Sequence, residues 1–154
     1  MQAEIEVTDV SYDADVAVQL IEEIQLDLTG RYGGPDETPV DPAAFAPPDG
    51  AFLLAYAGAD LVGCAGLRRH TADEVELKRM YIRVSHRRQG HARRLLGALE
   101  DRARAMGYRQ LVLETGLEQP EAIALYESAG YHPVPAFGYY ADSALSRSYG
   151  KTLA

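Results

Sequence analysis

The sequence predicts an α/β protein with one mixed central sheet: an antiparallel N-terminal meander, a parallel central pair, and helices on both faces. Three observations support this fold. Apolar runs of strand length cluster early in the chain, amphipathic helical stretches flank them, and a strand–helix–strand unit follows at 75–114. Because the crossover of such a unit is right-handed, its two strands pair in parallel. The 154 residues suit one domain, expected to span 1–154.

The first third of the chain predicts a strand, a helix and a loop. A short strand is expected around Ile5. Apolar residues recur at helical spacing from 13 to 28, and Gly30 is expected to end that helix. The stretch 31–39 is dense in Gly and Pro and predicts a loop, which a short helical turn at 42–45 follows. This region either shapes a substrate pocket or only connects its neighbours.

The middle of the chain predicts a meander that leads into the crossover. Runs at 52–56 and 61–67 form a hairpin, and 75–84 is a third strand. A turn at 86–90 precedes a helix at 91–106, whose apolar residues form one stripe. The remaining expected elements are a strand at 111–114, a helix from Pro120 to Gly130, and closing strands at 131–134 and 146–153.

Composition favours a packed interior and a cytoplasmic protein. Apolar residues make up 47% of the chain, yet no apolar run approaches the roughly 20 residues that cross a bilayer. The N-terminus lacks the basic-then-apolar layout of a secretion signal. Cys64 is the only cysteine, so no intramolecular disulfide can form, which suits a reducing compartment. The four histidines have no metal-ligand spacing and are expected at the surface, so no metal site is predicted.

The net charge of −8 is unevenly distributed. Residues 1–50 contain twelve acids and one base, Arg31, whereas residues 78–109 contain ten of the fifteen Lys and Arg. The split would suit a cationic acceptor that meets an anionic cofactor. Alternatively, the N-terminal acids only keep the protein soluble. Nucleic acid is not an expected partner, because the net charge is negative and aromatic residues do not interleave with the basic run.

The segment around Gly90 has the properties of a phosphate site. A β-like run leads into Arg87-Arg88-Gln89-Gly90-His91-Ala92, and an amphipathic helix leads out. Gly90 allows close approach of the backbone, while free N–H groups and the dipole at the helix start favour anionic oxygen. The arginines at 87, 88, 93 and 94 add charge that matches phosphate geometry. The pattern is neither a Walker loop nor a Rossmann fingerprint.

Together with its flanks, this segment resembles the GNAT superfamily of N-acetyltransferases. The acetyl-CoA motif of that family, [QR]-x-x-G-x-[GA], is filled by Arg87, Gly90 and Ala92. The preceding E-L-K-R-M-Y-I is similar to the family's fourth strand, and A-I-A-L-Y-E-S-A-G-Y is similar to its late helix. The resemblance covers residues 50–135 well. It implies acetyl-CoA as donor, coenzyme A as product, and a primary amine of a small molecule or amino acid as acceptor.

The resemblance also implies a cofactor site. Backbone groups of the fourth strand would pair with the pantetheine arm, and amides from Arg88 through Arg93 would hold the pyrophosphate. Gln119 stands where the family often has an asparagine that contacts the cofactor. The implied cofactor-binding residues are Met80, Tyr81, Ile82, Arg87, Arg88, Gln89, Gly90, His91, Ala92, Arg93, Gln119 and Tyr126.

Two catalytic residues are predicted for direct attack of the amine on the thioester. Tyr126 is the candidate acid for the departing thiolate, and the alternative is a core tyrosine. Glu76, fourteen residues before Gly90, matches the base that works through an ordered water in one branch of the superfamily. It could instead be an exposed strand residue paired with Lys78, with a water chain as base. A backbone N–H near Met80 would serve as oxyanion donor.

The acceptor pocket is expected between the 31–46 region and the 135–143 loop. Aromatic walls with carboxylates would suit a primary amine. The candidate lining residues are Tyr32, Glu37, Phe45, Tyr139, Tyr140 and Asp142. Two other functions stay open: a non-catalytic acyl-CoA-binding sensor and a protein or peptide N-acetyltransferase. A homodimer that pairs or exchanges the closing strand 146–153 is a further possibility.

Overall fold

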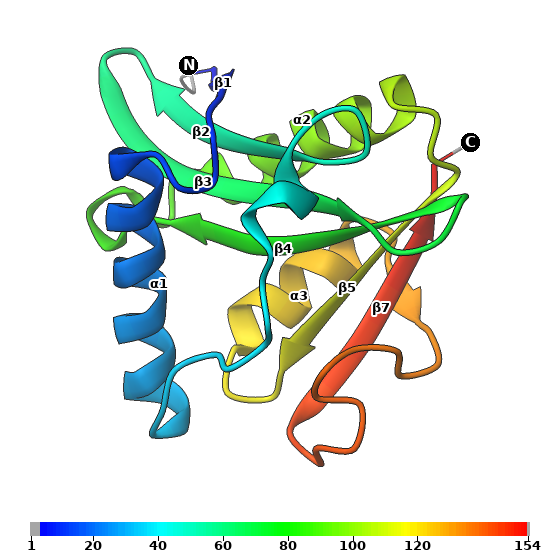
Figure 1. Cartoon of the computed structure of the whole chain (residues 1–154). Coiled ribbons are helices and arrows are strands. Elements are labelled where there is room, and N and C mark those ends of the chain that lie inside the picture. The colour runs from blue at the N-terminus through cyan, green and yellow to red at the C-terminus, as the bar shows by residue number, and fades with distance from the viewer. Residues whose placement is uncertain (1–3, 154) are drawn as a thin grey trace.

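The computed structural model describes residues 4–153 as a seven-stranded sheet with helices on both faces (Figure 1). The strand order is β1-β2-β3-β4-β5-β7-β6. Neighbouring strands are antiparallel except for β4 and β5, which pair in parallel. The predicted fold class is therefore confirmed. The strands are β1 (Glu6–Asp9), β2 (Ala51–Ala57), β3 (Asp60–Arg69), β4 (Glu74–Ile82), β5 (Gln110–Gly116), β6 (His132–Pro133) and β7 (Ser146–Thr152).

The helices divide the core into two layers. Helix α1 (Asp15–Tyr32) and the 3-10 turn η1 (Pro42–Phe45) cover one face of the sheet. Helices α2 (His91–Ala105) and α3 (Pro120–Ser128) cover the other face, and a second 3-10 turn, η2 (Val84–His86), leads toward α2. Leu95, Leu96 and Leu99 form the buried stripe of α2. Within residues 4–153, no helix is both long and apolar enough to cross a membrane.

Two predicted boundaries need correction. Helix α1 does not end at Gly30 but continues to Tyr32, because Gly33 is the glycine that adopts the left-handed cap, with φ of 81° and its N–H bonded to the Thr29 carbonyl. The third strand of the meander ends at Ile82, and Arg83 is the N-cap of the 3-10 turn that follows. The closing strand β7 pairs with β5 over its whole length and with β6 at two positions, so both of its edges make contacts within this chain.

Candidate functional site

The site begins where β4 and β5 separate. Their parallel ladder covers only Glu74–Leu77 with Gln110–Leu113, after which the two strands run apart (Figure 1). A bulge follows in β4: the β3–β4 register shifts between Cys64 and Gly66, and Arg79 adopts φ of +59°. The edge of β4 beyond Leu77 therefore has no partner on β5. We call the place where β4 and β5 separate the fork. Beyond Leu77, β4 has side chains on the face of the sheet and backbone groups at the fork that have no partner on β5.

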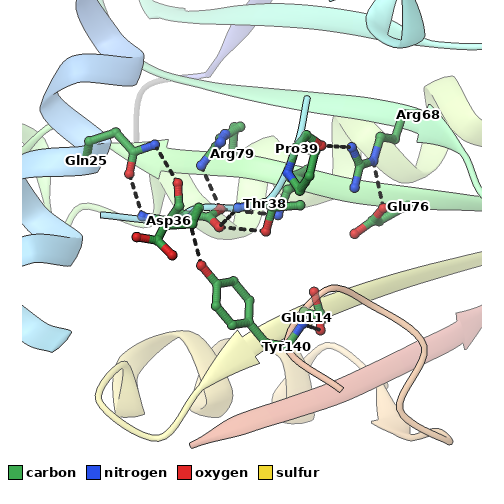
Figure 2. Close-up of polar contacts among 11 residues, drawn as sticks. Gln25, Asp36, Thr38, Pro39, Arg68, Glu76, Arg79, Glu114 and Tyr140 are labelled. Carbon is green, nitrogen blue, oxygen red and sulfur yellow. Dashed lines mark hydrogen bonds and ion pairs between the residues drawn. The ribbon is translucent and has the colours of Figure 1, made fainter. Parts of the chain in front are cut away.

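Asp36 fixes the loop after α1 to this bulge (Figure 2). Its Oδ2 accepts from Lys78 Nζ at 3.2 Å and from Arg79 Nη1 at 2.7 Å, and its Oδ1 accepts from the backbone and hydroxyl of Thr38. Its backbone exchanges two hydrogen bonds with the Gln25 side-chain amide. Burial opposes ionisation of this carboxyl, but Lys78, Thr38 and Arg79 outweigh it and lower the pKa of Asp36 to about 2.

A cavity of about 430 Å³ lies in the fork. It is lined by the end of α1, the loop 33–37, Lys78 of β4, residues 114–116 of β5 and the β6–β7 loop. Tyr140 closes it from the β6–β7 side, since its hydroxyl accepts the Glu37 backbone N–H at 2.7 Å (Figure 2). Loops from the two halves of the sheet are thus joined across the cavity, which limits the size of an acceptor that can enter.

Glu114 lies at the β5 side of the cavity. Its Oε2 accepts the Tyr140 backbone N–H at 3.1 Å, while Oε1 is buried and has no hydrogen-bond partner within residues 4–153. A Cβ on Gly138 would come within 2.1 Å of Oε1, so only glycine allows the loop to pack on this carboxylate. Burial raises the pKa of Glu114, although the Tyr140 N–H and Lys78 act in the opposite direction.

Tyr32 and Gln119 form the end wall of the cavity. The Tyr32 hydroxyl donates to Gln119 Oε1 at 3.1 Å and lies directly over Gly116, where a Cβ would meet the phenol oxygen at 2.0 Å. The side chain of Gln119, predicted to contact the cofactor, is thus held by a cavity-lining tyrosine.

The turn before α2 has backbone N–H groups that bond to no acceptor in the described chain. Arg88 and Gly90 adopt positive φ of 64° and 81°, and Gly90 is the N-cap. In the described chain, no backbone N–H from residues 88 to 93 has an acceptor. Such alternating conformations at a helix start make a concave nest of N–H groups that binds anionic oxygen. This geometry fits the diphosphate of coenzyme A.

The arginines of this segment have different surroundings. Arg87 Nε donates to the Ile82 carbonyl at 2.9 Å, and its guanidinium lies over the Tyr81 ring, so this side chain supports β4. Arg94 folds back to the Gln89 carbonyl at 2.9 Å, and Arg93 reaches Ser128 of α3. The exposed Arg88 has no acceptor within residues 4–153, which leaves it free for phosphate.

His91 differs from the surface residue that the sequence predicted. As the first residue of α2 its side chain is 4% exposed. Burial, Arg94 and His86 lower the pKa of His91, so the imidazole is neutral beside the amide nest.

Tyr126 is buried on α3 against the core that underlies β4 and β5. Its ring centroid lies 5.7 Å from that of Tyr131, and within residues 4–153 its hydroxyl has no hydrogen-bond partner. Burial raises the pKa of Tyr126, which keeps the phenol protonated. The neighbouring Tyr131 hydroxyl, by contrast, donates to Glu100 Oε2 at 2.8 Å.

Glu76 is neither exposed nor paired with Lys78, and that alternative is wrong. The residue is 5% exposed, and its Oε1 accepts from Arg68 Nε at 2.8 Å (Figure 2). Lys78 pairs with Asp36 instead, because the loop after α1 folds over β4 and supplies the nearer carboxylate. One oxygen of the Glu76 carboxylate is thus held by Arg68 across the β3–β4 pair.

The six predicted acceptor residues divide into two groups. Tyr32, Glu37 and Tyr140 line the cavity. Phe45 does not: it is 2% exposed, because it stacks on Tyr12 at 4.9 Å and packs edge-on against Phe52. Tyr139 and Asp142 are exposed on the β6–β7 loop and do not belong to the lining.

Asp36, Lys78 and Glu114 are the charged lining residues of the cavity that the sequence did not predict. The sequence position of Glu114 does indicate a site, because it is a lone acid at the carboxyl end of an apolar parallel strand, where ligand sites of α/β sheets lie. The sequence position of Asp36 indicates no site, since only the fold brings residue 36 to β4.

Comparison with known proteins assigns the class of this chain. The profile of the Acetyltransferase (GNAT) family matches residues 18–131, and the chain belongs to this family. It is an acetyltransferase by class, as the sequence predicted.

Individual relatives agree with this assignment. An IAA acetyltransferase of Azospirillum brasilense is 38% identical over 140 residues, which cover 90% of this chain and 92% of the relative. The structure of a proposed acyl-CoA N-acyltransferase of Klebsiella pneumoniae is 31% identical, with a TM-score of 0.79 over 97% of this chain and 98% of the other. A GNAT acetyltransferase of Elizabethkingia anophelis, solved with acetyl-CoA bound, shares the fold at 16% identity, with a TM-score of 0.72 over 97% and 98% of the two chains.

Proposed function

We propose that this protein is an acetyl-CoA-dependent N-acetyltransferase that acetylates a primary amine of a small molecule or amino acid by direct attack. One observation carries the proposal. At the fork, β4 contributes Lys78 to the cavity and, two residues later, a backbone edge without a partner on β5 that leads to the nest of N–H groups before α2. A donor and an acceptor can therefore approach the same point from two sides of one strand.

The chain's own residues fit the donor. Backbone groups of Met80, Tyr81 and Ile82, which have no partner on β5, would align the pantetheine arm as an added strand, and Arg87 Nε already holds the Ile82 carbonyl at 2.9 Å. The amides of Arg88 through Arg93, with the free Arg88 side chain, would hold the diphosphate. Acetyl-CoA supplies an activated acetyl group as a thioester.

Tyr126 is the proposed acid. A buried phenol without a protein partner can donate its proton or a hydrogen bond to a departing thiolate. The proposed base is not Glu76, whose carboxylate is bonded to Arg68. We propose Glu114 instead, because among the acids that line the cavity it is the one with a buried oxygen that has no hydrogen-bond partner within residues 4–153. A raised pKa suits a group that accepts a proton and later releases it.

The link between the two loops favours a small acceptor over a protein. The hydrogen bond between Tyr140 and the Glu37 backbone joins the loops on either side of the cavity, whereas a protein acceptor needs an open groove for its flanking chain. The sensor alternative has less support, because a protein that only binds acyl-CoA does not need a second cavity lined by Lys78 and Glu114. A cytoplasmic location and a homodimer stay predictions.

A thiol-release assay with acetyl-CoA and a broad panel of primary amines tests the proposal. IAA, the compound in the name of the Azospirillum relative, is assayed separately beside the amine panel. We expect amine-dependent release of coenzyme A and the N-acetyl product by mass spectrometry. Calorimetry should detect acetyl-CoA binding without an amine. Binding without turnover of any amine would support the sensor alternative, and absence of binding would reject both.

A further inference from the structure

Lys78 and Glu114 occupy equivalent positions on the two arms of the fork. They are the first residues after Leu77 and Leu113, the last pair of the parallel ladder. Since successive strand residues alternate between faces, and Leu77 and Leu113 point into the core beneath α2 and α3, Lys78 and Glu114 lie on the opposite face. Both line the cavity.

Lys78 is an incompletely neutralised cation. Its side chain is 9% exposed, and its one hydrogen bond or ion pair within residues 4–153 is with Asp36 Oδ2 at 3.2 Å. Arg79 shares that same oxygen at the shorter distance of 2.7 Å. An ammonium carries three donors, so two of them have no acceptor in the described chain. Leaving such donors buried is costly unless a ligand satisfies them.

Glu114 is the complementary acceptor. One oxygen receives the Tyr140 N–H, and the other is buried without a partner. Lys78 and Glu114 nevertheless form no ion pair with each other, because Asp36 holds the first and the β6–β7 loop holds the second. The cavity is therefore lined by a cationic donor, Lys78, and an anionic acceptor, Glu114, that do not neutralise each other by direct contact.

We propose that the acceptor is an α-amino acid or a similar zwitterion, whose carboxylate binds Lys78 and whose ammonium binds Glu114. The inference rests on the proposed acetyltransferase function. A simple amine would satisfy Glu114 and leave Lys78 unmatched, and a simple acid would do the reverse, so only a ligand with both charges satisfies both groups.

The remaining surroundings agree with this ligand. A cavity of about 430 Å³ accommodates an amino acid, and Leu28, Tyr32 and Pro35 offer apolar surface to its side chain. Acetylation removes the positive charge of the amine, so the product loses its attraction to Glu114 and is released. Recognition of the substrate and rejection of the product follow from the same carboxylate.

The first test compares matched substrates with the purified full-length protein. The twenty L-amino acids are assayed with acetyl-CoA, each against its carboxamide, which keeps the amine and removes the negative charge. We expect kcat/KM for the preferred amino acid to exceed that of its carboxamide at least about tenfold, as loss of one charge-assisted contact implies. Equal turnover of both would overturn the inference. If other amines are acetylated and the amino acids are not, the zwitterion is wrong while the acetyltransferase proposal stands.

The second test uses Lys78→Met, with Lys78→Arg as the charge-preserving control. Asp36 keeps Arg79 and Thr38 in both variants, so the loop retains its anchor. In Lys78→Met the preference for amino acid over carboxamide should fall to about one, and Lys78→Arg should restore most of it. If Lys78 only supports the loop, kcat/KM falls equally for both substrates and the preference is kept, which contradicts the inference. Glu114→Gln should weaken both substrates, because both carry the ammonium.

Discussion

Arg68 and Glu76 face each other at paired positions of β3 and β4, and Arg68 Nε donates to Glu76 Oε1 at 2.8 Å. Arg68 also donates to the Pro39 carbonyl at 3.3 Å, so it joins the sheet to the loop that precedes η1. Both side chains are largely buried. A carboxylate bound in this way holds structure together, and its position fourteen residues before Gly90 does not by itself make it a base.

Glu76→Gln should therefore affect stability more than turnover. We expect kcat to stay within about threefold, while the free energy of unfolding falls by about 1 to 2 kcal/mol because a charge-assisted bond becomes a neutral one. Steady-state kinetics and urea unfolding measure the two effects. Glu74→Gln, a more exposed change on the same strand, is the matched control and should lie within about 0.5 kcal/mol of the parent. A loss of about 100-fold in kcat by a fully folded Glu76→Gln would restore Glu76 as the base.

Tyr126→Phe should lower kcat by about 100-fold, the usual contribution of a positioned acid, and leave acetyl-CoA affinity nearly unchanged. Since its hydroxyl has no protein partner in the described chain, stability should change by less than about 0.5 kcal/mol. Single-turnover kinetics and calorimetry separate the two effects.

Tyr131→Phe is the control for that substitution. It removes a hydroxyl from an equally buried ring whose bond to Glu100 is structural, so it should cost about 1 kcal/mol of stability and little turnover. Normal turnover by Tyr126→Phe would remove the acid role.

The order of elements could be predicted because it depends on local patterns. Apolar periodicity located the strands and α2, and the crossover rule determined the parallel pair. The end of α1 was misplaced because residues 30, 33 and 34 are all glycines, and only the folded backbone shows which one adopts positive φ. Phe45 was assigned to the acceptor pocket for a similar reason, since its partners Tyr12 and Phe52 lie far away in sequence.

The uneven charge distribution along the sequence is explained in part by ion pairs between segments that lie far apart in sequence. Acids of the first fifty residues pair directly with bases of the 78–109 segment, as in Asp9–Arg102, Glu23–Arg83 and Asp36–Arg79. The two charge-rich segments therefore neutralise each other in part, through four of the twelve acids: Asp9, Glu23, Asp27 and Asp36. The charged groups proposed to bind ligands are confined to two places. They are Arg88 at the amide nest, and Lys78 and Glu114 at the fork.

Gly90→Ala should weaken acetyl-CoA binding. Gly90 has φ of 81°, and an added Cβ would lie 3.2 Å from the Arg94 guanidinium, so the nest must distort at a cost of about 1 to 2 kcal/mol. We expect the Kd for acetyl-CoA, measured by calorimetry, to rise about tenfold. Gly97→Ala, on the exposed side of the same helix with nothing within 4 Å, should bind normally and gain about 0.5 to 1 kcal/mol of stability. Equal Kd values for both variants would show that the nest does not hold the donor.

Asp36 makes the acceptor side of the site sensitive to acid. Its pKa is lowered from 3.8 to about 2, so ionised Asp36 stabilises the folded protein at every pH above 3.8, and this contribution is lost as the pH falls through about 2. A shift of this size corresponds to at most about 2.4 kcal/mol, and less where solvent reaches the group. Asp36→Asn should therefore lower the free energy of unfolding by about 1 to 2 kcal/mol at pH 7, and the difference from the parent should shrink toward pH 2.

Urea unfolding between pH 7 and pH 2.5 checks this expectation, with Asp41→Asn as the control. Asp41 caps η1 through Ala43 N at 3.0 Å, a bond that asparagine also makes, so its substitution should leave stability and the pH profile unchanged. Because Asp36 also positions the loop that lines the cavity, Asp36→Asn should raise KM for the acceptor and spare the Kd for acetyl-CoA, whose amide nest lies at the start of α2. A variant that lost both affinities together would show that the two halves of the fork are not independent, and that the anchor at Asp36 supports β4 as a whole.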